Sequence, residues 1–149
     1  MAILDSIIAR AKQNKQRIVL PEGTEERTLK AADQILAEGI ANIILLGNPN
    51  EINKLASEFG LKNISKATII DPENNPNSQK YIDLLLQLRQ RKGLQPEQAV
   101  ELVKDPLYLA CLLVKAGDAD GEVAGAKNYT GNVLRPAFQI IKTRQGAKC

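Results

Sequence analysis

Residues 17–49 read RIVLPEGTEERTLKAADQILAEGIANIILLGNP, and the alternation within this stretch decides the fold class. Residues 17–20 and 42–46 are short aliphatic runs, and the second is nearly continuous, as expected for a parallel strand covered on both faces. Between them, apolar residues recur at helical spacing over 24–38, with Thr24 as the expected helix cap. A strand, a helix and a further strand in this order predict a crossover unit in a parallel sheet.

The same alternation extends in both directions along the chain. Upstream, residues 2–13 have the spacing of an amphipathic helix. Downstream, strands are expected at 67–70 and 122–126, and helices are expected at residues 49–59, 78–92, 96–104, 107–116 and from Thr130 onward. Pro136 is expected to kink the last of these helices or to postpone its start. The sequence therefore predicts an α/β fold, a parallel sheet with helices on both faces.

The composition excludes several functional classes. The 149 residues, 44% hydrophobic and 25% charged, are one soluble domain's worth of chain. The sequence has no histidine, which removes a Ser-His-Asp triad and most zinc sites. The net charge of +3 is small and dispersed, and aromatic residues make up only 3% of the chain, so no nucleic-acid partner is expected.

The cysteines and the apolar segments indicate a reducing compartment. Cys111 and Cys149 are too few for a disulfide scaffold, and Cys111 has the setting of a small buried apolar residue. No signal-peptide core opens the chain, and no apolar run approaches the roughly 18 residues of a membrane span. We therefore expect a cytoplasmic protein without a membrane partner.

The best candidate site lies in residues 120–142, DGEVAGAKNYTGNVLRPAFQIIK, which predict a strand, a polar turn and a helix. Free N–H groups at such a junction face the crevice beyond the strand ends, where anions bind. Thr130 would meet an anion there with its hydroxyl, and Arg135 would neutralise the charge. Neither of two familiar glycine-rich phosphate loops, G-x-x-x-x-G-K-[ST] or G-x-G-x-x-G after the first strand, is present, which disfavours an unrelated nucleotide-binding protein.

Purely structural roles remain open for each of these residues. Thr130 would serve equally as a helix cap, and Arg89 would suit the negative end of its helix as well as a polyanionic ligand. Arg27 lies at the end of the first strand and would face either an anion or nearby acids. Asp118 and Asp120 precede the last strand, so they are interpreted as turn residues away from the ligand.

Three segments carry a resemblance to a known family. RIVLPEG-x-EERTLKAA at 17–32, ILLGNP at 44–49 and ADGEVAGAKNYTGNVLRPAFQIIKT at 119–143 resemble the N-terminal part of phosphate acetyltransferases, in order and at natural spacing. Phosphate butyryltransferases and the C-terminal domain of bacterial malic enzymes share parts of these segments. Where family members often carry an apolar residue and then His, this chain has Lys127 and Asn128, and Lys127 would either help to bind phosphate or point to solvent.

The resemblance implies reversible acetyl transfer between acetyl-CoA and inorganic phosphate, without a metal or redox cofactor. It implies an isocitrate/isopropylmalate dehydrogenase-like fold of two α/β domains, in a homo-oligomer that is usually a dimer. Residues 1–149 would be an N-terminal α/β domain segment, without the second domain and the C-terminal part. Thr130, Arg135 and Arg89 map onto CoA or phosphate contacts, whereas the family's catalytic Ser, Arg and Asp groups would lie downstream of Cys149. The chain alone would then be inactive. A non-catalytic module that senses acyl-CoA or mediates oligomerisation, as in malic enzymes, is the alternative.

Overall fold

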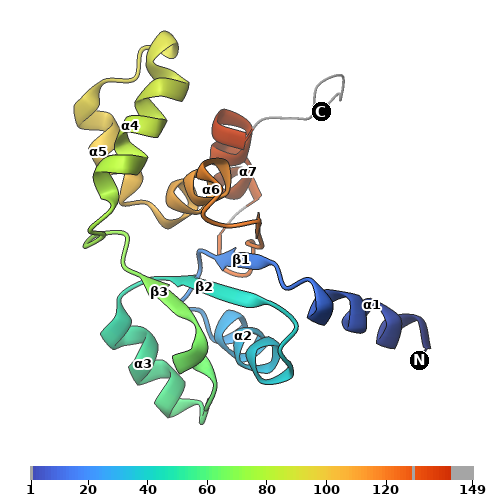
Figure 1. Cartoon of the computed structure of the whole chain (residues 1–149). Helices are drawn as coiled ribbons and strands as arrows, with labels where there is room; N and C mark the ends of the chain where they lie inside the picture. The colour runs from blue at the N-terminus through green and yellow to red at the C-terminus, as the bar shows by residue number, and fades with distance from the viewer. Residues whose placement is uncertain (1, 129, 142–149) are drawn as a thin grey trace.

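A parallel sheet in the order β3-β2-β1-β4 forms the centre of the molecule in the computed structural model, which describes residues 2–128 and 130–141 (Figure 1). The strands are β1 (Arg17–Leu20), β2 (Asn42–Leu46), β3 (Thr68–Ile70) and β4 (Gly121–Glu122). All three neighbouring pairs are parallel. The chain steps outward from β1 to β3 and then returns to place β4 on the other side of β1. The predicted α/β fold class is confirmed.

Helices cover both faces of this sheet (Figure 1). One face packs on α2 (Glu26–Glu38) and α3 (Pro49–Glu58), which enclose a core that includes Ile43 and Leu45. The opposite face contributes Val19 and Ile44 to a second core with α4 (Ser78–Arg89), α5 (Pro96–Val103) and α6 (Pro106–Ala116). The near-continuous apolar run of β2 follows from this arrangement, because its successive side chains enter different cores.

The central helix of the second core is α6. Its residues from Leu107 to Leu113 are all buried, which explains why this segment lacks a polar face. Asp105 caps α6 by accepting a hydrogen bond from the Leu107 N–H at 2.9 Å. The last described segment is α7 (Thr130–Pro136), which continues as a π-helical turn at Ala137–Ile141. The change of helix type directly after Pro136 agrees with the disturbance predicted there.

Two sequence predictions about local structure were wrong. Glu25, not Thr24, caps α2, because its longer carboxylate reaches the Thr28 N–H at 2.9 Å. The last strand is also shorter than the predicted residues 122–126, since β4 ends at Glu122 and residues 123–128 form a loop.

The first helix, α1 (Ala2–Gln13), extends away from the sheet (Figure 1). Its apolar face is open to solvent, with Ile3 79% and Ile7 58% exposed. In residues 2–128 and 130–141, no helix has both the length and the apolar character needed to cross a membrane.

Candidate functional site

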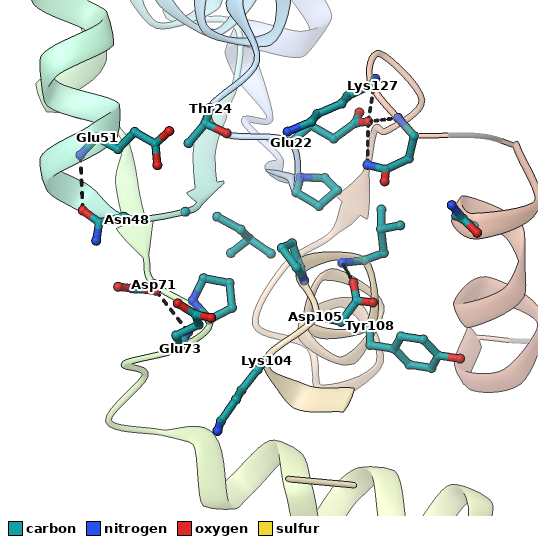
Figure 2. Close-up of a pocket in the computed structure, with 18 of the residues that line it drawn as sticks. Glu22, Thr24, Asn48, Glu51, Asp71, Glu73, Lys104, Asp105, Tyr108 and Lys127 are labelled. Atoms are coloured by element: carbon teal, nitrogen blue, oxygen red, sulfur yellow. Dashed lines mark hydrogen bonds between the residues drawn. The ribbon is translucent and has the colours of Figure 1, made fainter. Parts of the chain in front are cut away.

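A cleft lies at the carboxyl edge of the sheet, where the segments that follow all the described strands converge (Figure 2). It encloses about 540 Å³. The chain runs outward from β1 to β3 and returns to β4 on the other side of β1, so the strand order has a switch point between β1 and β4. Ligands bind in the crevice beyond the strand ends at such a point. The cleft is lined by Pro21, Glu22 and Thr24 after β1, Gly47 and Asn48 after β2, Asp71, Pro72 and Glu73 after β3, and Lys127 and Asn128 after β4. Leu46, Glu51, residues 104–108, Asn132 and Arg135 complete the lining.

The turn after β1 comes unusually close to β2. The Gly23 N–H donates to the Leu46 carbonyl oxygen at 3.2 Å, and a Cβ atom at Gly23 would lie 2.4 Å from that oxygen. Only glycine fits a backbone approach of this kind. The Gly47 N–H in turn donates to the Ile70 carbonyl at 3.0 Å. These contacts bring the ends of β1, β2 and β3 together on one side of the cleft.

Glu22 joins the turn after β1 to the loop after β4. Its Oε1 accepts hydrogen bonds from the N–H groups of Gly125 at 2.8 Å and Ala126 at 2.9 Å. Its Oε2 accepts from the N–H groups of Lys127 and Asn128, both at 2.7 Å, and from Nδ2 of Asn128 at 2.9 Å. These N–H groups point to one carboxylate instead of to a neighbouring strand, which is why β4 does not extend through Gly125 and Ala126.

The electrostatics of Glu22 follow from these donors. Its side chain is buried, with the residue only 6% exposed, and burial by itself would raise its pKa. The hydrogen bonds from Asn128, Lys127 and Ala126 outweigh burial and lower the pKa from 4.5 to about 2. Glu22 is therefore an ionised carboxylate inside the molecule at neutral pH.

Arg135 and Arg89, two of the sequence-predicted residues, lie near the same tyrosine. Arg135 lines the cleft, whereas Arg89 is half-buried at the end of α4 and is not part of the lining. Burial raises the pKa of Tyr108, and the positive charges of Arg135 and Arg89 oppose this rise. Both cations thus act on one phenol, which donates a hydrogen bond to Oε1 of Gln139 at 3.1 Å. Thr130 begins α7, but its side chain lies outside the described part of the structure.

The structure assigns structural contacts to the other residues singled out from the sequence. Arg27 donates to Oε1 of Glu25 at 3.0 Å and to the Ala126 carbonyl oxygen, so it braces the loop after β4. Asp120 pairs with Arg17, and Asp118 accepts hydrogen bonds from Lys80 and Tyr81. These pairs lower the pKa of both aspartates. Both lie at the amino end of the sheet, away from the cleft, as predicted.

Charge is distributed unequally across the cleft. Figure 2 shows Glu51, Asp71 and Glu73 on the side formed by α3 and the end of β3, with Lys127 on the opposite side. Arg135 also lines the cleft. Among residues 2–128 and 130–141, no three Cys, Asp or Glu side chains come together so as to hold a metal ion. The arrangement can accommodate a polar ligand whose anionic part faces Lys127 and Arg135.

Sequence reasoning missed Glu22, Lys104 and Tyr108. The position of Glu22 directly after β1 was a usable signal, because residues after parallel strands line the same edge. Lys104 comes from the connection between α5 and α6 and Tyr108 from the first turn of α6, so neither directly follows a strand in the sequence. Only the packing of α6 on the sheet brings them to the cleft.

Together, the strand order and the cleft define an open parallel α/β fold with a cleft at a topological switch point. The chain belongs to the phosphate acetyl/butaryl transferase family, whose sequence model matches residues 2–149. The resemblance noted in the sequence is thereby confirmed.

Individual relatives agree with this assignment. The chain is 54% identical over 148 residues to a phosphate acetyltransferase of Thermoanaerobacterium thermosaccharolyticum, covering 99% of this chain and 44% of the relative. It is 47% identical to a phosphate acetyltransferase of Clostridium acetobutylicum, with the same coverage of 99% and 44%. A phosphotransacetylase structure from Streptococcus pyogenes superposes with a TM-score of 0.93 at 32% identity, again over 99% of this chain and 44% of that one. The chain thus spans less than half the length of the relatives it matches.

Proposed function

We propose that the protein is a phosphate acetyltransferase, which transfers an acetyl group reversibly between CoA and inorganic phosphate. The observation that carries this proposal is the match over 99% of the chain to relatives of that name. The cleft is compatible with it, because acetyl phosphate, phosphate and CoA are all anionic and Lys127 and Arg135 supply positive charge.

Within this proposal, Arg135, Arg89 and Thr130 bind the phosphate groups of the substrates. A guanidinium can grip a phosphate with two parallel hydrogen bonds, and it can also stabilise the negative charge that develops on the carbonyl oxygen during transfer. Acetyl transfer between a thiol and phosphate changes no oxidation state, so the proposal includes no metal or redox cofactor. The general base and the remaining catalytic groups are placed on polypeptide beyond residue 149, in a two-domain, homo-oligomeric, cytoplasmic enzyme.

The decisive experiment measures thiol release from acetyl-CoA, with and without phosphate, by the 149-residue chain and by the complete encoded protein. We expect phosphate-dependent release from the complete protein and none from residues 1–149 alone. Butyryl-CoA in the same assay reports the acyl preference within the family. Retained CoA binding without any thiol release from the complete protein would contradict the proposal and favour a sensing module.

Arginine variants test the binding roles. We expect Arg135→Ala and Arg89→Ala in the complete protein to raise the KM for phosphate or CoA about tenfold or more, because each loses a charge-assisted hydrogen bond. The matched control is Arg91→Ala, since Arg91 is exposed on the turn after α4 and, unlike Arg135 and Arg89, is not among the charges that act on the cleft residue Tyr108. If the KM values of Arg135→Ala and Arg89→Ala are no higher than that of Arg91→Ala, Arg135 and Arg89 do not bind the substrates.

A further inference from the structure

The loop after β4 has the form of an anion-binding site that the protein itself has filled. Its N–H groups from Gly125 to Asn128 converge on one point, and backbone N–H groups in such a concave arrangement bind anions. The anion here is the carboxylate of Glu22, which comes from the other side of the switch point, 103 residues or more earlier in the chain. Because Glu22 takes all of these N–H groups, none of the four is left to bind a substrate phosphate in this cleft.

The loop is also held from a second direction. Arg27 on α2 donates to the Ala126 carbonyl oxygen while Glu25 orients its guanidinium. Glu22 thus holds the N–H groups of the loop and Arg27 holds one of its carbonyl groups. The side chain of Lys127 emerges from this loop into the cleft.

Arg135 lies on the helix that follows the same loop. The helix that carries Arg135 begins at Thr130, two residues after Asn128, so the loop is the connection that joins α7 to the sheet. A binding group fixed in place before its ligand arrives loses less conformational entropy on binding. Any loosening of the loop is therefore expected to weaken the binding of anions in the cleft.

We propose that Glu22 is a positioning residue, which closes the switch point between β1 and β4 with its carboxylate and thereby fixes Lys127 and Arg135 for a phosphate-bearing substrate. The role of the loop does not depend on the reaction, whereas the identity of the ligand rests on the proposed function. Glu22 touches no reacting atom in this proposal and acts only through the loop.

The test is Glu22→Gln in the complete encoded protein, because the amide has the size of the carboxylate but replaces one acceptor oxygen with a donor. Hydrogen exchange should become faster at the N–H groups of residues 125–128. The KM for phosphate should rise about tenfold, with a much smaller change in kcat, as for the loss of a ground-state binding interaction. Unchanged exchange, or faster exchange with an unchanged KM, would overturn the proposal.

A matched control separates this role from general stability. Asp33→Asn alters another partly buried carboxylate that accepts a loop N–H, that of Asn63 at 2.7 Å, but Asp33 is not part of the lining of the cleft. It should leave exchange at 125–128 and the KM for phosphate unchanged.

If Glu22→Gln does not fold, Arg27→Ala provides the test, since this exposed side chain holds the same loop. It should give a change of the same kind in both measurements, and no change in either would overturn the proposal. A wild-type protein without acetyl transfer would refute the proposed function, whereas the exchange measurement would still test the loop.

Discussion

All the donors to the Glu22 carboxylate are N–H groups, so its contribution to the stability of the fold depends on whether it is ionised. Burial raises the pKa of Glu22, but its hydrogen bonds lower it to about 2 from an ordinary value of 4.5. A pKa that is lower in the folded than in the unfolded state stabilises the fold fully above about 4.5, and this contribution is lost as the pH falls toward 2.

Acid unfolding should therefore depend on Glu22. We expect the free energy of unfolding of the wild-type protein to fall between pH 4.5 and 2, and the fall to be shallower in Glu22→Gln. At pH 7 the variant should be less stable by about 1.5–3 kcal/mol, because buried donors lose a charged acceptor. Urea unfolding across this pH range provides the measurement. Glu26→Gln is the control, since the exposed pair of Glu26 with Lys30 contributes at most a few tenths of a kcal/mol.

The surroundings of Cys111 favour its neutral form, whereas those of Glu22 favour the charged form. It is fully buried, and its thiol donates to Oε2 of Glu122 at 3.2 Å. Burial raises the pKa of the thiol, and the nearby carboxyl group of Glu122 raises it further. Since only the thiolate is nucleophilic, the native protein should leave Cys111 unmodified.

A thiol-labelling experiment checks this expectation. In a Cys149→Ser variant, where Cys111 is the only cysteine of the sequence, a disulfide reagent should react slowly in buffer and completely in urea. Rapid labelling of the folded variant would mean that the α6 core opens far more readily than its burial indicates.

At the scale of the elements, Gly23 limits how closely β1 and β2 can be joined. A Cβ atom at this position would meet the Leu46 carbonyl oxygen at 2.4 Å, and the backbone atoms involved cannot rotate away. We expect Gly23→Ala to destabilise the protein by about 2–4 kcal/mol through strand separation. Gly131→Ala on α7 is the comparison, because no atom lies within 4 Å of the added Cβ. It should stabilise α7 by about 0.5–1 kcal/mol. Thermal unfolding of both variants measures the difference, and similar midpoints would show that the β1 turn adapts.

The elements that the sequence predicted well are those specified by contiguous residues. β1 and β2 have their predicted bounds, because each is a short apolar run ended by Pro or Gly. The predicted helix at 78–92 becomes α4, which ends at Arg89, followed by a 3-10 turn over Gln90–Lys92. The predicted strand at 122–126 was too long because the N–H groups of Gly125 and Ala126 are taken by Glu22, a contact between distant parts of the chain that no local pattern encodes.

The site was predictable to a similar extent. Its location followed from the rule that ligands bind beyond the carboxyl ends of parallel strands. Arg135 lines the cleft, as the pattern of strand, turn and helix suggested. The roles of Thr130, Arg135 and Arg89 in ligand binding stay predictions. The hydrogen bonds from the loop after β4 to Glu22, and the place of Tyr108 in the lining of the cleft, were not predictable. Both depend on the tertiary packing of α6 and of that loop.

At the scale of the whole molecule, several large apolar side chains of the described residues lie on the surface. Alongside the exposed face of α1, large apolar side chains such as Val123 and Phe138 face solvent. In the described residues, β4 pairs only with β1, so its other edge has no strand partner. Apolar surface of this kind and an open edge both favour association with another surface.

We therefore expect the isolated 149-residue chain to self-associate with increasing concentration through α1. Light scattering coupled to gel filtration should show a mass above 16.3 kDa at high concentration. The double variant Ile3→Lys/Ile7→Lys should shift the chain toward the monomer, because it places charges on the exposed apolar face of α1. Gln13→Lys, which adds a charge at the end of the same helix but removes no apolar side chain, is the control. If α1 drives association, only the double variant changes the mass. A chain that is monomeric at high concentration, or a double variant that assembles as the wild type does, would show that the exposed apolar face of α1 does not drive self-association.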